Sequence, residues 1–595
     1  MKKIIALVLA MILSFSVLSV SSFAADAAGI TSFSIKNITD SENDADIVVN
    51  WFASNSKYYL FVPAVMSLDE AVIDFAASAD VYCGETKLTD GDSAAFLKDK
   101  QQMTLTCDGA SYDVVIFSES KVASVFIETE SGSLDAVHAD KEHKEKGKIT
   151  IINTDGETEC AGLLDYIKGR GNSTWGMPKK PYNIKLEEKE NLFGMGKSKK
   201  WSLIANYADT SLLRNSLAYL AAENAGVPYT PKFTPVDVYI NGNYEGAYLL
   251  TTRVEVDKTR VNIQNLEDEN EEANPDVDIE ALPRGGVYGS TSGYLENTKK
   301  WIEIPNNPKD ITGGYIIETE LPSRYDEEIS GFVTENSQAI ILKSPEYASK
   351  EQIEYISGWY QNFENAVYGN KGLAEIAKYC NVESLVDVYL LNEWYANHDA
   401  GLTSTYLYKP VNDTLYAGPV WDYDRAFGNC DRIRFGIDYN KPEQWTVCHS
   451  RLYGVTILGA GDTSDIPTFY NHITKNQQFI DMCKEKWNGV IKSAVGEAAE
   501  YITTEYAENA EGSAVANAIR WNTYGTSDIA EIKTKYAADV KKVADFAQAK
   551  ADYITANIGV IAEREAETDF EDKFNIFFSN VLEKLVRIFR LENLI

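Results

Sequence analysis

The period of the apolar residues changes along this chain of 595 residues, and that change limits its fold more than any other feature. From about Ile30 to Thr129, apolar and polar residues alternate in short runs, which is the two-residue period of half-buried strands. From Lys350 onward, helical patterns dominate. Strands grouped before helices predict an α+β fold, and the length predicts two or three domains.

The chain divides into segments with different sequence patterns. The first 25 residues combine two lysines, an apolar stretch and small residues, which indicates a secretory signal peptide cleaved after Ala24 or Ala27. A retained membrane anchor is the alternative. The rest is interpreted as a small all-β, immunoglobulin-like module at 29–130, a main domain at 149–558 and an amphipathic helix at 568–595. That helix is expected to dock on its own domain, to pair with another chain or to lie on a membrane surface.

Composition limits the partners. The formal charge of −33 argues against binding to nucleic acid or to anionic membranes. Beyond the leader, no segment has the ~18 uninterrupted apolar residues of a transmembrane helix. Seven cysteines without a C-x-x-C pair predict neither a disulfide-stapled scaffold nor a zinc site, although Cys83 and Cys107 lie in strand-like segments where they can pair.

The first part of the main domain is expected to contain two strands, a long helix and two more strands. The helix is predicted from about Trp201 to Ala225, and the last two strands are joined by a turn at Gly242-Asn243. The acidic segment from Leu266 to Glu280 is interpreted as a solvated loop.

A basic hairpin, KGRGNSTWGMPKKPYNIKLEEK (Lys168–Lys189), stands out in this acidic chain. It contains Arg170 beside glycines whose backbone N–H groups can converge on an anion. Lys185 ends an alternating strand, as the nucleotide-binding lysine of protein kinases does. The hairpin is therefore either a phosphate-binding element or an ordinary solvated surface.

Two carboxylate motifs follow. Asp399 lies in a loop after a helix, where a carboxylate can orient a hydroxyl nucleophile or simply cap the helix. In GPVWDYDRAFGN, Asp422 and Asp424 follow a strand, where they can hold Mg²⁺ or pair with an arginine. A lysine on a strand, then a loop aspartate, then a strand-borne aspartate is the order of parts in a two-lobed kinase.

Four segments then identify a family by resemblance: RGNSTWGMPKKPYNIKL, WSLIANYADTSLLRNSLAYLAA, VYINGNYEGAYLLTTRVE and GPVWDYDRAFGN. From about Ile149 to Trp521, the chain resembles the CotH family of secreted and spore-coat atypical protein kinases. The resemblance implies a two-lobed protein-kinase-like domain, with lobes at about 149–260 and 310–558. It also implies the use of ATP with Mg²⁺ or Mn²⁺, and phosphorylation of serine or threonine on partner proteins.

The resemblance further assigns roles to single residues. Asp399 would be the catalytic aspartate and Asp422 the principal metal ligand. The supporting residues would be Lys185, Arg170, Asp209 and Arg214 at the nucleotide, and Asp424 and Ser404 at the metal.

Two neighbours of Asp399 need separate comment. Kinases usually carry Asn five positions after the catalytic aspartate, and relatives of this family often do; Ser404 is a weaker metal ligand, for which Asn397 or Asp424 can compensate. His398 is interpreted as a surface histidine, or as a residue that tunes Asp399.

The expected function is that of an exported kinase, secreted or held at a bacterial surface, with an extracellular or spore-coat protein as its substrate. The alternative is a surface, adhesion or spore-coat assembly protein that keeps the kinase-like fold without turnover. The leading β module, export to where ATP is scarce and Ser404 favour this alternative.

Overall fold

The computed structural model describes residues 29–38, 41–287, 298–430, 433–434, 437–452, 456–457, 461–462 and 466–561. These residues form two compact units. The first contains residues up to Asn37, 50–60 and 67–116, and the second contains the others. The expected signal peptide at 1–25 and amphipathic helix at 568–595 lie outside the described residues.

The first unit is all β. Strand β1 (Ile30–Asn37) pairs antiparallel with β5 (Val72–Ala77), and a second sheet has the order β3-β4-β9-β8-β6-β7. The strands of that sheet are, in this order, Phe52–Ser54, Lys57–Phe61, Ala110–Phe117, Gln102–Cys107, Val81–Cys83 and Thr86–Leu88. In β8, every second side chain is buried, as the alternating sequence predicts.

The cysteines of this unit do not form the disulfide that the sequence allowed. Cys83 lies opposite Leu105, and Cys107 lies opposite Val81, so the two cysteines are diagonal rather than facing neighbours. Both are free thiols, as are the other five cysteines.

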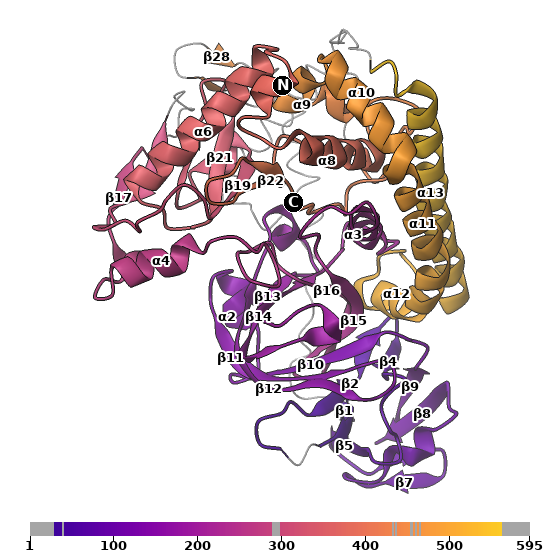
Figure 1. The fold of residues 1–595 in the computed structure, drawn as a ribbon. Helices are drawn as coiled ribbons and strands as arrows, with labels where there is room; N and C mark the ends of the chain where they lie inside the picture. The colour runs from indigo at the N-terminus through magenta and orange to yellow at the C-terminus, as the bar shows by residue number, and fades with distance from the viewer. Residues whose placement is uncertain are drawn as a thin grey trace, which may run out of the picture. The chain divides into compact units, whose positions relative to one another are not determined.

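The second unit begins with a closed barrel of seven strands in the order β10-β11-β12-β13-β14-β16-β15 (Figure 1). The strands are, in this order, Ala123–Thr129, Glu145–Ile152, Thr158–Gly169, Tyr182–Glu190, Ser198–Ile204, Asn243–Thr251 and Phe233–Ile240. Parallel pairing between β10 and β15 closes the barrel. Strand β10 therefore belongs to the second unit, although the sequence pattern placed it in the N-terminal module, because its alternation continues that of the strands before it.

The long helix expected from Trp201 to Ala225 is shorter in the structure. Trp201 and Leu203 point into the barrel from β14, because two residues with one between them lie on the same face of a strand. Helix α3 begins only at Arg214 and ends at Asn224. The intervening residues form a buried loop, which positions part of the candidate site. The β15–β16 hairpin is confirmed, with its positive φ angles at Asn241 and Gly242.

A seven-stranded antiparallel sheet follows, in the order β17-β18-β20-β21-β19-β22-β23. Its strands are Arg284–Gly286, Lys299–Ile302, Gly331–Val333, Ala339–Ser344, Tyr315–Glu320, Thr405–Lys409 and Tyr416–Ala417. The longer helices of the rest of the unit are α6 (Lys350–Tyr368), α8 (Val382–Tyr395), α10 (Gln477–Lys486), α11 (Lys492–Tyr501), α12 (Ala507–Trp521) and α13 (Ile529–Asn557). Figure 1 shows α13 running along α11 and α12.

The acidic segment after Asn265 corrects a second expectation, since it starts with helix α4 (Leu266–Ala273) instead of a loop. The side chain of Asn265 accepts hydrogen bonds from the N–H groups of Glu267 and Asp268 and so caps the helix. Acidic residues in the first turn stabilise the helix further, because their negative charge interacts favourably with the positive end of the helix dipole. Across residues 29–561 as described, no helix is both long and apolar enough to cross a membrane.

Candidate active site

Three aspartates from two loops form the centre of the site. Asp399 lies in the loop between α8 and β22, and Asp422 and Asp424 lie in the loop that follows β23. The Asp422 side chain is exposed, but the surrounding protein reduces its solvation, and this desolvation is the main cause that raises its pKa; the negative charge of Asp399 raises it further. The structure therefore brings the predicted catalytic aspartate and the predicted metal ligand together.

Asp422 and Asp424 have different surroundings. Asp422 is exposed and has a φ of 68°, in the left-handed region that non-glycine residues rarely occupy. Asp424 is buried, and its pKa is raised by burial and by the charges of Asp422, Asp209 and Asp399. An accessible carboxylate therefore lies beside a buried one, at a place where negative charge is in excess. Strained backbone at such a place is common in functional sites.

Arginines supply the positive charge that acts on Asp422. Arg170 follows β12, and its guanidinium lies 5.5 Å from the ring of Trp421, the residue before Asp422. Arg170, Arg324 and Arg425 all lower the pKa of Asp422, and Arg170 has the largest effect of the three. Of Arg170 and Lys185, the two residues of the basic hairpin that the sequence proposed for phosphate binding, Arg170 is the one that acts on Asp422.

Lys185 has a different environment. Its neighbours Ile184 and Leu186 point into the barrel core, so Lys185 points outward from β13. There its ammonium forms an ion pair with Asp165 at 2.7 Å, and its side chain remains 33% exposed. This partner differs from the nucleotide phosphates that the kinase analogy predicts. The role of Lys185 at the nucleotide therefore stays a prediction.

The Asp399 loop is held by side chains on both sides. The backbone N–H of Asp399 donates to Asn397 Oδ1 at 3.1 Å, and Asn397 donates to Asn392 Oδ1 at 2.8 Å. Further along the loop, Thr403 Oγ1 donates to Glu320 Oε1 at 2.7 Å. These hydrogen bonds fix the conformation of the loop and therefore the position of Asp399.

His398 is not the surface histidine that the sequence suggested. It is 3% exposed, and its Nε2 lies 3.3 Å from Asp399 Oδ1. Hydrophilic neighbours in sequence made the position look exposed, whereas the tertiary structure buries it beside Tyr439. The histidine is thus placed to orient the Asp399 carboxylate.

Comparison with known proteins identifies a family. A family model described as CotH kinase protein matches residues 167–554, more than half of the chain. The chain belongs to the CotH kinase protein family. No match appears in the search of curated proteins. Membership of the CotH family implies an atypical protein kinase that uses ATP.

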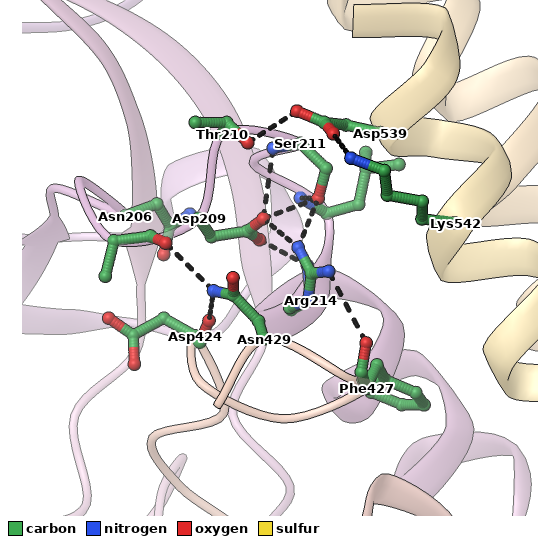
Figure 2. A network of polar contacts seen from close by, with 12 residues as sticks. Asn206, Asp209, Thr210, Ser211, Arg214, Asp424, Phe427, Asn429, Asp539 and Lys542 are labelled. Atoms are coloured by element: carbon green, nitrogen blue, oxygen red, sulfur yellow. Dashed lines mark hydrogen bonds and ion pairs between the residues drawn. The ribbon is translucent and has the colours of Figure 1, made fainter. Parts of the chain in front are cut away.

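In this CotH family member, Asp209 and Arg214 are structural neighbours of the site rather than open ligand groups. Asp209 is fully buried and Arg214 is 5% exposed, and their side chains form an ion pair. Arg214 Nε donates to the carbonyl of Ala426 at 3.0 Å, and Nη2 donates to that of Phe427 at 3.4 Å. Figure 2 shows the Arg214 guanidinium directed at the carbonyl of Phe427, and the Asp424 carboxylate directed away from the Asp209–Arg214 pair.

The aspartates also fit a divalent metal. Within the described part of the chain, no group of three or more His, Cys, Asp or Glu side chains is arranged to hold a metal by itself. Mg²⁺ in kinases needs only one or two carboxylates, because phosphates and water complete its shell. The crowded negative charge at Asp422 and Asp424 matches that chemistry, with Asp422 as the accessible ligand.

Sequence reasoning missed several residues of the CotH site, among them Arg324, Arg425 and Glu320. Glu320 is 2% exposed and holds Thr403 of the Asp399 loop, while Arg324 lies 3.7 Å from Glu320 and acts electrostatically on Asp422. Arg425 was visible beside Asp424, but only as a candidate structural ion pair. Nothing in the sequence indicates that β19, which ends at Glu320, pairs with β22 next to the Asp399 loop.

Proposed function

We propose that this chain is an exported kinase that transfers the γ-phosphate of ATP to a serine or threonine hydroxyl of a partner protein. The observation that carries the proposal is the meeting of Asp399, Asp422 and Arg170 at one place. Arg170 lies far from the two aspartates in the sequence, so tertiary folding brings together the residues to which the proposal assigns the roles of base, metal ligand and phosphate-binding cation. This set is what phosphoryl transfer requires, since its catalysis consists mainly of positioning and charge neutralisation.

Each residue has a defined part in the proposed reaction. Asp399 orients the substrate hydroxyl and accepts its proton as the new O–P bond forms and the bond to the departing ADP breaks. Arg170, together with Arg324 and Arg425, offsets the negative charge of the phosphates. Asp422, with Asp424 behind it, would hold Mg²⁺ or Mn²⁺, which supplies further charge neutralisation at the phosphates. His398 and Asn397 keep Asp399 in place.

Transfer of labelled phosphate from ATP tests this proposal. We expect the wild-type protein to label itself or an added protein substrate, and Asp399→Asn and Asp422→Ala to lose at least ~100-fold of the rate. Asp545→Asn is a matched control, because Asp545 is an exposed residue of α13 that forms a surface ion pair with Lys541. Equal labelling by all four proteins would refute the proposal.

A second function is supported by Ser404. A protein with a weak ligand at this position can keep the kinase-like fold and bind partners at a cell surface or in a spore coat without turnover. Calorimetric titration with Mg-ATP separates the two functions, because a catalytic protein must bind the nucleotide. No heat of binding at millimolar nucleotide would favour the adhesion or assembly function.

Export and surface location are part of the same proposal. They are supported by the leader-like pattern of the first 25 residues. Sequencing the N-terminus of the mature protein would show residue 25 or residue 28 first if the leader is removed. An intact N-terminus on protein recovered from the cytosol would contradict export.

A further inference from the structure

The loop that carries the site aspartates is held in place by side chains, because it contains no strand or helix of its own. We call residues 422–430 the aspartate loop, and residues 206–215, which precede and begin α3, the anchor segment. Asn215 Oδ1 accepts the N–H of Tyr423 at 2.7 Å, and Asn429 Nδ2 donates to the carbonyl of Ala208 at 2.8 Å. Arg214 adds its two bonds to carbonyls of the aspartate loop. The anchor segment therefore sets the position of the aspartate loop.

The anchor segment is itself held from its other side by helix α13. Thr210 Oγ1 donates to Asp539 Oδ2 at 2.5 Å, and the hydroxyl of Tyr524 donates to the same carboxylate at 2.9 Å. Lys542 donates to Asp539 Oδ1 at 2.8 Å, and these donors lower the pKa of Asp539 although burial opposes them. In Figure 2, Asp539 reaches from α13 to Thr210, while Asp209, the residue before Thr210, faces Arg214.

A second contact joins α13 directly to the aspartate loop. Gly428 has a φ of 72°, and a Cβ atom added there would lie 2.8 Å from the ring of Phe546. The helix also contacts α8, which leads into the Asp399 loop, since Trp394 of α8 donates its Nε1–H to the carbonyl of Ala547 at 3.0 Å. Helix α13 thus contacts the aspartate loop directly and the helix that precedes the other site loop.

We propose that Asp539 is a positioning residue for the aspartate loop and acts through Thr210 and the Asp209–Arg214 pair. The inference rests on the proposed function for its catalytic meaning, but the mechanical link is a property of the fold itself. An ionised Asp539 holds Thr210, and Thr210 lies next to Asp209, whose carboxylate accepts hydrogen bonds from both the backbone and the guanidinium of Arg214. Loss of the Asp539 charge therefore loosens the aspartates without removing any group that contacts nucleotide.

Hydrogen exchange of the metal-free protein tests the mechanical link. The N–H groups of Tyr423 and Phe427 are the probes, because each donates a hydrogen bond to a fixed partner, Asn215 and Tyr395 respectively. We expect exchange at both to be about fivefold to tenfold faster in Asp539→Asn and in Thr210→Val than in the wild type. Thr210→Ser keeps the hydroxyl and is expected to restore slow exchange. Asp545→Asn, on the same helix, is expected to leave it unchanged.

Metal dependence tests the consequence for the site. In Asp539→Asn, the Mg²⁺ concentration for half-maximal ATP binding should rise severalfold, while Asp545→Asn keeps the wild-type value. The double variant Asp539→Asn with Thr210→Val should show no additional loss, because both changes break one link.

Each outcome has a defined meaning. Wild-type exchange and wild-type metal dependence in both Asp539→Asn and Thr210→Val would overturn the inference, even if those variants melt earlier. If Asp539→Asn does not fold, the comparison of Thr210→Val with Thr210→Ser decides the matter. If the wild-type protein binds no nucleotide, the proposed function fails, whereas the exchange experiment still tests the link.

Discussion

At the scale of single residues, the backbone conformation at position 404 is one that favours Asn, although the residue there is Ser. Ser404 has a φ of 52°, a left-handed conformation in which Asn is several times more common than other residues. The resemblance to kinases also favours Asn at this position. The backbone is therefore already suited to the residue that the sequence lacks.

Ser404→Asn should improve the site. Asn relieves part of the roughly 1–3 kcal/mol that a left-handed non-glycine residue costs, and its carbonyl is a stronger metal ligand than a hydroxyl. We expect an unchanged or slightly higher melting temperature and a lower Mg²⁺ requirement for ATP binding. Calorimetry and thermal unfolding measure these two effects. A higher Mg²⁺ requirement would show that the side chain at position 404 points away from the metal.

Buried Lys179 predicts a pH effect on stability. It is fully buried and donates to Ala205 O, Ala247 O and Asn517 Oδ1, and burial lowers its pKa to about 7. Between pH 7 and its ordinary value of 10.5, the unfolded chain therefore binds more protons at this residue than the folded chain. By linkage, the free energy of unfolding gains up to about 1.4 kcal/mol per pH unit in this window.

Urea unfolding at pH 7, 8 and 9 checks this effect, with Lys179→Met as the reference. The difference between the two proteins should grow in favour of the wild type as the pH rises. Asp237 and Glu245 lie nearby with pKa values raised mainly by burial, and both carboxyls are present in the wild type and in Lys179→Met alike. Parallel pH profiles for the two proteins would contradict the prediction.

At the scale of elements, the ends of helices were easier to predict than the contacts between helices and the site. Helix α6 begins at a capping box of Ser349 and Gln352, and α8 begins at Asn381, which caps the N–H of Ser384. Such signals are local, so the sequence contains them. The packing of α13 behind the site depends on residues more than 100 positions apart, and no local pattern encodes it.

The buried pair between α8 and α13 yields an element-scale prediction. Lys550 and Glu393 are both fully buried, with Nζ 2.8 Å from Oε1, and Glu393 also accepts the N–H groups of Thr446 and Val447. Lys550→Met leaves the Glu393 charge without its cation, which should lower the free energy of unfolding by about 3–5 kcal/mol. Lys541→Met breaks an exposed pair on the same helix and should cost less than ~1 kcal/mol. Denaturant titration compares the two, and similar losses would argue against the pair.

At the scale of the whole molecule, the two units are interleaved along the chain. Residues 38–49 and 61–66 belong to the second unit although they lie within the N-terminal β region. Within the second unit, Thr150 donates to the carbonyl of Ala45 at 2.8 Å, and Tyr239 donates to that of Phe61 at 2.8 Å. The boundary near residue 130 that the sequence suggests would therefore cut through one folded unit.

Removal of the N-terminal region should for this reason destabilise the kinase-family domain. A chain that starts at residue 131 lacks the second unit's residues 38–49 and 61–66 and also strand β10, so the barrel cannot close. We expect it to melt well below the full chain or to be insoluble. Phe61→Ala in the full chain should lose about 3–5 kcal/mol, because Phe61 is buried and packs on Tyr244. A shortened chain with the full chain's melting temperature would contradict the interleaved arrangement.

The sequence by itself determined the family, the α+β class and the identities of the central aspartates, because motif residues and apolar periods are local properties of the chain. It also predicted strands within β12 and β13, from the segments YIKGRG and PYNIKLE. The tertiary structure alone decided which side chains meet. It placed Arg170 rather than Lys185 at Asp422, buried His398 beside Asp399, and directed Arg214 at the aspartate loop instead of at open space. Asp422 and Asp424 have the same chemistry and nearly the same sequence context, and only the packing around them makes one accessible and the other buried.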